Sequence, residues 1–303
     1  MEKHVKWRNS NKISMENSKP LISVLIPNYN NSHFLLNAVE SVFCQTYSNW
    51  FVVICDDGST DHPEAMYKEL SRDSRIKILK NEDNRGVAYT RKRLIEETDC
   101  ELMCFLDPDD ELTPNALEDH IRVHEEHPNV SIVFSRRYLC DENLKIKDES
   151  RILTIHSDKS YFTTKDFREE HLVSFKKSFY NKTPGMNPIY RLAEDTYLNV
   201  IMEEVGEVYC LDKICYKYRR SSNGLTGDYG RHMFWNMLVQ YDTCKRRGID
   251  VENQVYDWFE NMMDFVAKEK VYQKELEIRQ SYAYRLGEFL LSPIKFVKKL
   301  LKK

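Results

Sequence analysis

The sequence contains no run of about 18 apolar residues, so no helix that spans a membrane is expected. Residues 1–20 are polar and lack the apolar core of a signal peptide, which predicts a flexible lead-in and a cytoplasmic protein. The formal net charge is only −3, so the overall charge gives no indication of a nucleic-acid partner. Eight cysteines in 303 residues do not make a disulfide scaffold, and several lie in apolar runs, which indicates reduced thiols.

Two nucleotide-binding fingerprints are also missing. The P-loop pattern G-x-x-x-x-G-K-S/T does not occur, and no G-x-G-x-x-G follows a predicted strand. These absences argue against a P-loop enzyme and against a dinucleotide-binding fingerprint. The composition, with 41% hydrophobic and 31% charged residues, is typical of a soluble globular protein with a core in one or two domains.

Apolar runs and helical patterns alternate through the first half of the chain. Near-continuous apolar runs are typical of strands that are covered on both faces. The predicted strands are 21–29, 50–59, 75–81, 101–107 and 130–139, and the predicted helices are 33–45, 63–73, 87–98 and 114–127. Because the links are short, the pattern predicts an α/β fold with a mostly parallel central sheet, flanking helices and right-handed crossovers.

The second half is less regular. Helices are predicted at 165–181 and 193–206, and one or two strands at 207–219. From about Asp228 the pattern is helical and rich in aromatic residues. Four histidines are expected on helix surfaces rather than as ligands; they are His33, His120, His124 and His127.

Polar clusters follow three of the predicted buried strands. They are Pro27–Asn30, Asp56–Ser59 and Asp107–Asp110. Any one of them is good turn chemistry, but ligands of open α/β sheets bind at the carboxyl ends of the strands, where all three are expected. Carboxylates gathered on one edge repel one another unless a cation or hydrogen-bond donors compensate them. Oxygen ligands on such loops suit Mg²⁺ or Mn²⁺.

Three stretches carry a resemblance to a known family. They are "SVLIPNYNNSHFLLNAVESVFCQTYSNWFVVICDDGSTD" at 23–61, "NRGVAYTRKRLIEETDCELMCFLDPDDELTPNALE" at 84–118, and "AEDTYL" at 193–198. Together they resemble the family 2 glycosyltransferases of bacterial cell-surface polysaccharide synthesis, which are inverting enzymes with the GT-A fold. The resemblance covers about residues 21–226, and its strength is that three motifs occur in order with family-like spacing.

The resemblance implies a nucleotide pocket. The two acids after the second strand would accept hydrogen bonds from the base and the ribose, and the stretch before the third helix would lie beside the nucleotide. The implied nucleotide-binding residues are Pro27, Tyr29, Asn30, Asp56, Asp57, Arg85, Gly86 and Asp107. A plain turn remains the alternative for Asp56 and Asp57.

The resemblance also implies the reacting groups. Asp109 would bind a divalent cation, Mn²⁺ or Mg²⁺, that holds the diphosphate, and Asp110 would face the sugar or support the metal. Asp195, after Glu194, matches the catalytic base. The alternative for Glu194 and Asp195 is that two acids at a helix start simply stabilise the helix dipole.

One motif departs from the family pattern. The family often continues with Tyr-Arg-x-His-x-x-Ser-x-Thr, and here "YRRSSNGLT" (218–226) has Ser221 for the His and Gly224 for the Ser. Support for the diphosphate would then come from elsewhere, and Arg219 and Arg220 are suited to bind phosphate.

The resemblance implies a domain plan. Residues 21–226 would form the GT-A domain, with a nucleotide-sugar half at about 21–110 and an acceptor half at about 111–226, followed by a helical extension at 227–303. The extension ends in a basic amphipathic stretch with five Lys in its last ten residues. That tail suits an anionic membrane surface, at the inner face of the cell membrane, and a helix packed on the protein is the alternative.

The expected function is transfer of a sugar, with inversion, from a nucleotide-diphosphate sugar, most simply a UDP-sugar, to a glycan or lipid-linked acceptor. A carboxylate takes the proton of the acceptor hydroxyl, and no covalent nucleophile is needed. Two alternatives stay open: a catalytically impaired sugar-nucleotide-binding protein, because of the altered 218–226 motif, and a nucleotidyltransferase, which would want a phosphate-binding loop rich in Gly, Arg and Lys early in the chain.

Overall fold

A computed structural model describes residues 21–150, 171–220, 229–250, 271 and 274. The predicted lead-in, Ser221, Gly224 and the basic tail lie outside the described residues. The chain divides into two compact units, residues 1–227 and 228–303, and each is described by itself. In the second unit the described helix is α7 (Tyr229–Arg247), within the region predicted to be helical.

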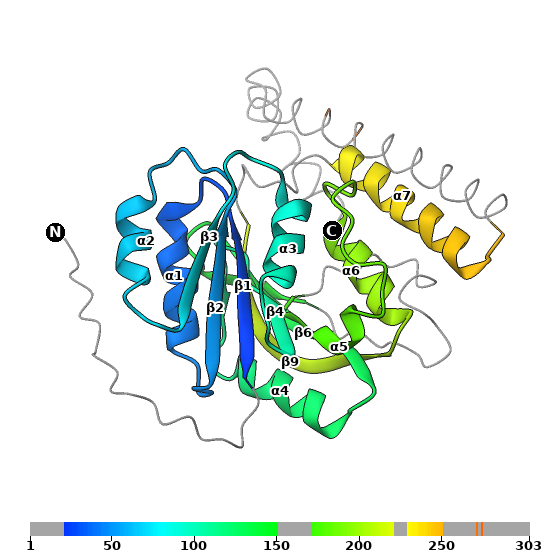
Figure 1. The fold of residues 1–303 in the computed structure, drawn as a ribbon, viewed down its shortest axis with the longest axis horizontal. Coiled ribbons are helices and arrows are strands. Elements are labelled where there is room, and N and C mark those ends of the chain that lie inside the picture. Colours follow the sequence, from blue (N-terminus) through cyan, green and yellow to red (C-terminus); the bar gives the residue numbers. More distant parts are fainter. Residues whose placement is uncertain (1–20, 151–170, 221–228, 251–270, 272–273, 275–303) are drawn as a thin grey trace, which may run out of the picture. The chain divides into compact units, whose positions relative to one another are not determined.

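The first unit begins with alternating strands and helices, as predicted (Figure 1). Each of the four strands and three helices predicted between residues 21 and 107 is confirmed. They are β1 (Ile22–Asn28), α1 (Ser32–Phe43), β2 (Trp50–Asp56), α2 (Glu64–Leu70), β3 (Ile76–Lys80), α3 (Val87–Glu96) and β4 (Leu102–Phe105). Adjacent strands in the order β3-β2-β1-β4 are all parallel.

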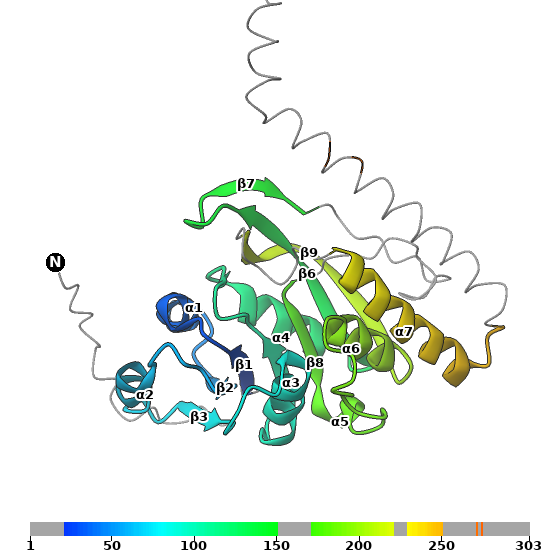
Figure 2. The same cartoon turned by 90° about the horizontal axis from the view of Figure 1, so that it is seen from above.

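The rest of the unit extends this sheet with strands in both directions (Figure 2). Its elements are β5 (Glu111–Leu112), α4 (Ala116–Glu126), β6 (Val130–Cys140), β7 (Ile146–Glu149), β8 (Val173–Lys176), α5 (Lys177–Tyr180), α6 (Glu194–Glu203) and β9 (Glu207–Arg219). The sheet continues as β4-β8-β6-β9-β5, and β7 pairs with β6. Strands β6 and β9 are parallel, whereas β8, β7 and β5 pair antiparallel with their neighbours. The α/β fold class is confirmed.

The helix predicted at 165–181 is wrong over its central part. Residues 165–170 lie outside the described residues. Between 171 and 181, Val173–Lys176 form strand β8 and only Lys177–Tyr180 form a helix. The reason lies in tertiary structure: β8 fills the space between β4 and β6 and hydrogen-bonds to both, with Ser174 and Phe175 fully buried. Local helix propensity is a weak preference that such pairing overrides.

The continuous apolar strands are buried on both faces, as their composition predicted. Alternate side chains of β1, such as Ile22, Val24 and Ile26, pack in a core with apolar residues of α1, α2 and α4. The opposite face of β1 and β2 is covered by α3. This burial leaves the carboxyl ends of the strands as the place where polar residues can gather. None of the helices in the described part of the chain has the length and apolar character needed to cross a membrane.

The surface position predicted for two histidines is wrong. His120 and His124 are 0% and 4% exposed, one turn apart on the face of α4 that packs on β8. The hydroxyl of Ser174 lies 2.7 Å from Nδ1 of His120 and 2.9 Å from Nε2 of His124. The two rings therefore fasten α4 to β8 through one shared hydroxyl.

Candidate active site

The three polar clusters lie together at the carboxyl ends of adjacent strands. Asn28 at the end of β1 is paired with Asp56 at the end of β2, and the backbone N–H of Asp57 donates to the carbonyl of Asn28 at 2.8 Å. The third cluster follows β4, which is the neighbour of β1 on its other side. The sheet topology thus brings together residues that are about 80 positions apart.

The carboxylate of Asp57 is engaged in hydrogen bonds within the protein. It accepts hydrogen bonds from the Asn81 side chain at 2.6 Å and from the backbone N–H groups of Arg85 and Gly86 at 2.9 and 2.8 Å. The residue is 3% exposed. Asp57 therefore shapes the loop that leads into α3.

The other residues implied for the nucleotide differ in accessibility. Tyr29 is 43% exposed and presents an aromatic ring at the end of β1. Asn30 has a positive φ of 52° and accepts the backbone N–H of Thr60 at 2.7 Å, which ties the first turn to the second. Asp56 is buried and accepts the N–H of Ser59. Pro27 is buried within β1, which favours a packing role.

In the loop after β4, two of the three acids, Asp107 and Asp110, also form hydrogen bonds within the protein. Asp107 accepts a hydrogen bond from Arg91 at 2.9 Å and lies 3.7 Å from Nε2 of His171. Burial by itself raises the pKa of Asp107, but Arg91 and His171 outweigh it and lower that pKa below its usual range. Asp110 is 1% exposed and accepts the backbone N–H of Arg219 at 2.7 Å. Burial and the neighbouring Asp109 raise the pKa of Asp110 well above its usual value.

Asp109 is the acid of this loop whose carboxylate stays available. It is partly exposed, and within the described ranges no other side chain makes a hydrogen bond or ion pair with it. Burial and the charge of Asp107 raise the pKa of Asp109 to about 6. A raised carboxyl pKa means that the ionised form lacks compensating charge, which a bound cation would supply.

Arg91, a residue that the sequence interpretation did not single out, connects this loop to the later acidic motif. It lies on α3, is 8% exposed, and places Nη2 on Asp107 and Nη1 at 3.5 Å from Oε1 of Glu194. The only sequence signal was its position inside the 84–118 stretch; the side-chain contacts follow from how α3 packs on the sheet.

The two acids of the later motif differ in exposure. Glu194, the first residue of α6, is 7% exposed, and burial raises its pKa to about 8 against the opposing effect of Arg91. Asp195 is exposed, and its carboxylate accepts the backbone N–H of Thr196 at 2.7 Å. Of this pair, Asp195 is therefore the carboxylate that a ligand can reach.

Arg219 was predicted to bind phosphate. In the structure its side chain forms hydrogen bonds within the protein, one of them to the loop after β4. Nε donates to the carbonyl of Asp109 and Nη1 to that of Glu142, both at 2.6 Å, while the guanidinium lies 4.1 Å from the centre of the Phe34 ring. Arg219 is buried, whereas Arg220 is exposed. Arg219 thus holds the loop of Asp109 in place, and Arg220 is the more accessible of the two cations.

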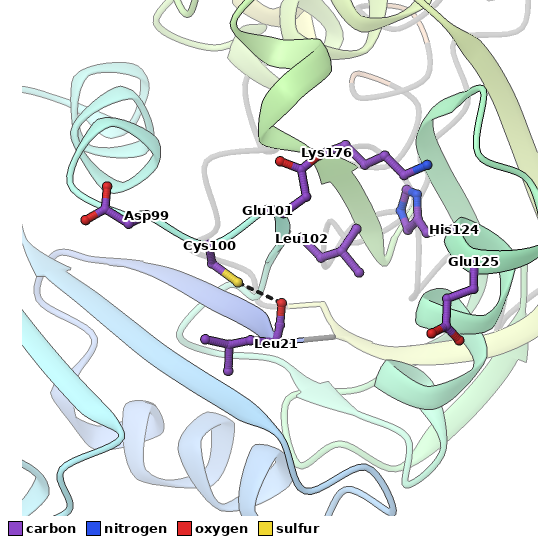
Figure 3. A pocket seen from close by; sticks show the side chains of 8 residues that line it. All are labelled: Leu21, Asp99, Cys100, Glu101, Leu102, His124, Glu125 and Lys176. Atoms are coloured by element: carbon purple, nitrogen blue, oxygen red, sulfur yellow. Dashed lines mark hydrogen bonds between the residues drawn. The ribbon is translucent and has the colours of Figure 1, made fainter. Parts of the chain in front are cut away.

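A pocket of about 400 Å³ lies elsewhere in this unit (Figure 3). Its lining includes Leu21, which precedes β1, and Leu102, which begins β4, so it opens at the amino ends of these strands. The acidic clusters lie at the carboxyl ends. The pocket is therefore separate from the candidate site.

Among the described residues no group of three or more His, Cys, Asp and Glu side chains is arranged to hold a metal ion. A cation at Asp109 would accordingly take one protein carboxylate and depend on a ligand for other oxygens. Mg²⁺ is commonly bound in this way, through one or two carboxylates and substrate phosphates. The residues present fit a cation that arrives with a diphosphate.

Comparison with known proteins gives a family match. Residues 23–186 match the model of the family described as Glycosyl transferase family 2. The UDP-Glc:alpha-D-GlcNAc-diphosphoundecaprenol beta-1,3-glucosyltransferase WfgD of Escherichia coli is 35% identical over 123 residues, which are 41% of this chain and 48% of WfgD. The aligned part of the chain therefore spans about half the length of that relative.

Solved structures share the fold. TarS 1–349 of S. aureus in complex with UDP has a TM-score of 0.57 and 18% identity, over 72% of this chain and 64% of that one. The mannosyltransferase PcManGT of Pyrobaculum calidifontis in complex with GDP-Man and Mn²⁺ has a TM-score of 0.56 and 13% identity, over 94% and 88%. At these identities the likeness is one of fold.

Proposed function

The chain belongs to the glycosyl transferase family 2, and from this membership we propose that it transfers a sugar from a UDP-sugar to a saccharide or lipid-linked acceptor in cell-surface polysaccharide synthesis. WfgD, which is similar over 41% of the chain, uses UDP-Glc and an acceptor on diphosphoundecaprenol by its name. The neighbour TarS is seen with UDP and with UDP-GlcNAc.

One observation carries the proposal. Of the acids that the fold gathers at this edge, five are engaged by the protein: Asp56, Asp57, Asp107, Asp110 and Glu194. Asp109 and Asp195 keep carboxylates that a ligand can use. Two available carboxylates, one following a strand and one on α6, suit a reaction that must bind a diphosphate and remove a proton.

The donor would be held at the strand ends. The exposed ring of Tyr29 is suited to stack on the base, and Asp56 and the loop shaped by Asp57 would line the nucleotide. Asp109 would hold Mn²⁺ or Mg²⁺ together with the diphosphate oxygens. When bound, such a cation stabilises the charge that develops on the leaving nucleoside diphosphate.

Asp195 would act as the base. Its exposed carboxylate takes the proton of the acceptor hydroxyl as the oxygen attacks the anomeric carbon from the face opposite the leaving diphosphate. This single displacement inverts the anomeric centre and requires no covalent intermediate. Glu194, buried against Arg91, is not suited to that role and would fix the start of α6.

The decisive experiment is a donor panel. Purified protein is incubated with UDP-glucose, UDP-GlcNAc and other nucleotide sugars, with Mn²⁺ or EDTA, and release of UDP is measured with and without GlcNAc-diphosphoundecaprenol. Turnover of at least one UDP-sugar supports the proposal. Calorimetric UDP binding without turnover of any donor supports the impaired binding protein, and pyrophosphate release from a nucleoside triphosphate and a sugar phosphate supports the nucleotidyltransferase.

The membrane partner is a separate part of the proposal. A lipid-linked acceptor would place the enzyme at a membrane surface, and the basic residues of 294–303 would supply a peripheral attachment at the inner face of the cell membrane. This tail lies outside the described residues, so the support comes from its sequence and from the acceptor of WfgD.

A further inference from the structure

Arg91 lies between the two halves of the candidate site. One end of its guanidinium donates to Asp107, two residues before Asp109, and the other end faces Glu194, the residue before Asp195. Asp109 and Asp195, the carboxylates that the proposed reaction needs, thus each lie within two residues of a side chain that Arg91 contacts.

The environment of Arg91 excludes a direct role with the substrate. The residue is 8% exposed, and its guanidinium lies 4.9 Å from the centre of the Phe105 ring. Its Nε is buried and has no hydrogen-bond partner in the part of the chain that the structure describes. The two terminal nitrogens, which face Asp107 and Glu194, therefore account for what Arg91 does.

The two partners of Arg91 are restrained to different degrees. The loop of Asp107 has other supports, because the N–H of Asp107 donates to the Tyr216 hydroxyl at 3.0 Å and Arg219 holds Asp109 and Asp110. Helix α6 begins at Glu194, and Ala193, which precedes it, makes no side-chain cap hydrogen bond to the helix start. Among the described residues, Arg91 links Glu194, at the start of α6, to Asp107 in the loop after β4.

We propose that Arg91 is a positioning residue for sugar transfer: by holding Asp107 and Glu194 with one rigid guanidinium, it fixes the separation between Asp109 and Asp195. The inference rests on the proposed function. Only an arginine has a planar fork that reaches two carboxylates at once, whereas lysine is a single point charge. Without Arg91, Asp107 and Glu194 lose the partner that they share, and the helix start is released from the loop.

The test compares Arg91→Lys, Arg91→Met and Glu194→Met with the wild type. Hydrolysis and transfer are measured with UDP-glucose and UDP-GlcNAc, and UDP binding in Mn²⁺ by calorimetry. The matched control is Arg75→Lys, because Arg75 also forms a forked pair with an aspartate, Asp73, but lies before β3 at the other edge of the sheet.

A positioning role gives a specific pattern. We expect Arg91→Lys to lower kcat about 100-fold, since small misplacements of reacting groups have effects of that size, with donor KM and UDP binding within about threefold. Glu194→Met, which keeps the pair between Arg91 and Asp107, should lower kcat with UDP binding unchanged. In the double variant Arg91→Met with Glu194→Met, the losses should not multiply, because both changes break one connection. Arg75→Lys should keep the wild-type kcat.

Several results would overturn the inference. It fails if Arg91→Lys keeps kcat within about threefold of the wild type, or if the losses in the double variant multiply. It also fails if Arg91→Lys and Glu194→Met lose UDP binding in proportion to activity, which would indicate a role in the fold or in holding the donor. If the wild type turns over no nucleotide sugar, the proposed function fails first and this inference with it; if the wild type is active, the variants test the role of Arg91 alone.

Discussion

Asp57 accepts the backbone N–H of Gly86 at 2.8 Å, and this contact joins the end of β2 to the start of α3. The same carboxylate accepts the N–H of Arg85. Of the pair Asp56-Asp57, which resembles a nucleotide-binding motif, Asp57 therefore stabilises the loop before α3. Gly58, the next residue, allows the close approach. An ideal Cβ on Gly58 would lie 2.7 Å from the carbonyl carbon of Asp83, and its φ is +69°.

A first prediction concerns this approach. Gly58→Ala should destabilise the protein by at least about 1 kcal/mol more than Gly248→Ala, because the two sites have similar positive φ but only Gly58 is crowded by backbone. Urea unfolding of the two variants measures the difference. UDP binding should weaken in Gly58→Ala as the 83–86 loop is pushed outward. Equal stability of the two variants would show that the 83–86 loop moves away from the added methyl group without a loss in the free energy of unfolding.

A second prediction concerns the cation. Asp109→Asn should lower UDP-sugar turnover at least about 100-fold, because the diphosphate loses the stabilisation that a metal held by an anionic oxygen provides. Mn²⁺ should no longer strengthen UDP binding in calorimetry. Asp99→Asn is the control, since Asp99 is a fully exposed acid beside the pocket at the other edge of the sheet. Unchanged Mn²⁺ dependence would remove Asp109 from the metal site.

The sequence predicted the parts of this structure that depend on local pattern. Strands such as β1 are covered on both faces, so their residues are apolar throughout and the strand is visible in the sequence. The carboxyl ends of parallel strands meet at one edge, so the acids of Asp56–Ser59 and Asp107–Asp110 were expected together, and they lie together.

The parts that failed depend on partners far away in the chain. Strand β8 exists because β4 and β6 leave a space for it, and His120 and His124 are buried because that strand brings Ser174 to α4. The hydrogen bonds that Asp57 and Arg219 form within the protein could not be predicted either. Their partners include backbone groups whose positions only the fold defines.

A third prediction concerns the base. Asp195→Asn should lower kcat by about 10² to 10⁴, the range that general acid–base catalysis contributes, while UDP binding stays near the wild-type value. The reason is that an amide in place of Asp195 cannot take the acceptor proton, and the exposed side chain is not needed by the fold. Transfer and calorimetry are measured on the same preparation. Near-normal transfer, or loss of UDP binding alone, contradicts the assignment.

A fourth prediction concerns stability at low pH. Burial lowers the pKa of both His120 and His124 to about 3, from 6.5. Below pH 6.5 the unfolded chain binds protons at these residues and the folded protein does not, so stability present at neutral pH is lost as the pH falls from 6.5 toward 3. By pH 5 each buried histidine should remove on the order of 2 kcal/mol.

Two variants isolate this contribution from that of the carboxylates. His120→Asn and His124→Gln keep a nitrogen near the position that faces Ser174 but do not titrate. We expect the free energy of unfolding, measured with urea at pH 7 and pH 5, to change less with pH in either variant than in the wild type. The same pH dependence in all three proteins would mean that the histidines accept protons without unfolding.

The last prediction concerns the tail. Deletion of residues 294–303 should release the protein from anionic vesicles and spare hydrolysis of the donor, because five Lys in ten residues each contribute about 1 kcal/mol near an anionic surface. Binding of the full chain should weaken with salt, which screens exposed charges beyond about 8–10 Å. Co-sedimentation at low and high salt measures both effects. A helix packed on the protein would behave differently: its deletion would lower the melting temperature, and the full-length chain would stay in the supernatant with anionic lipid at low salt.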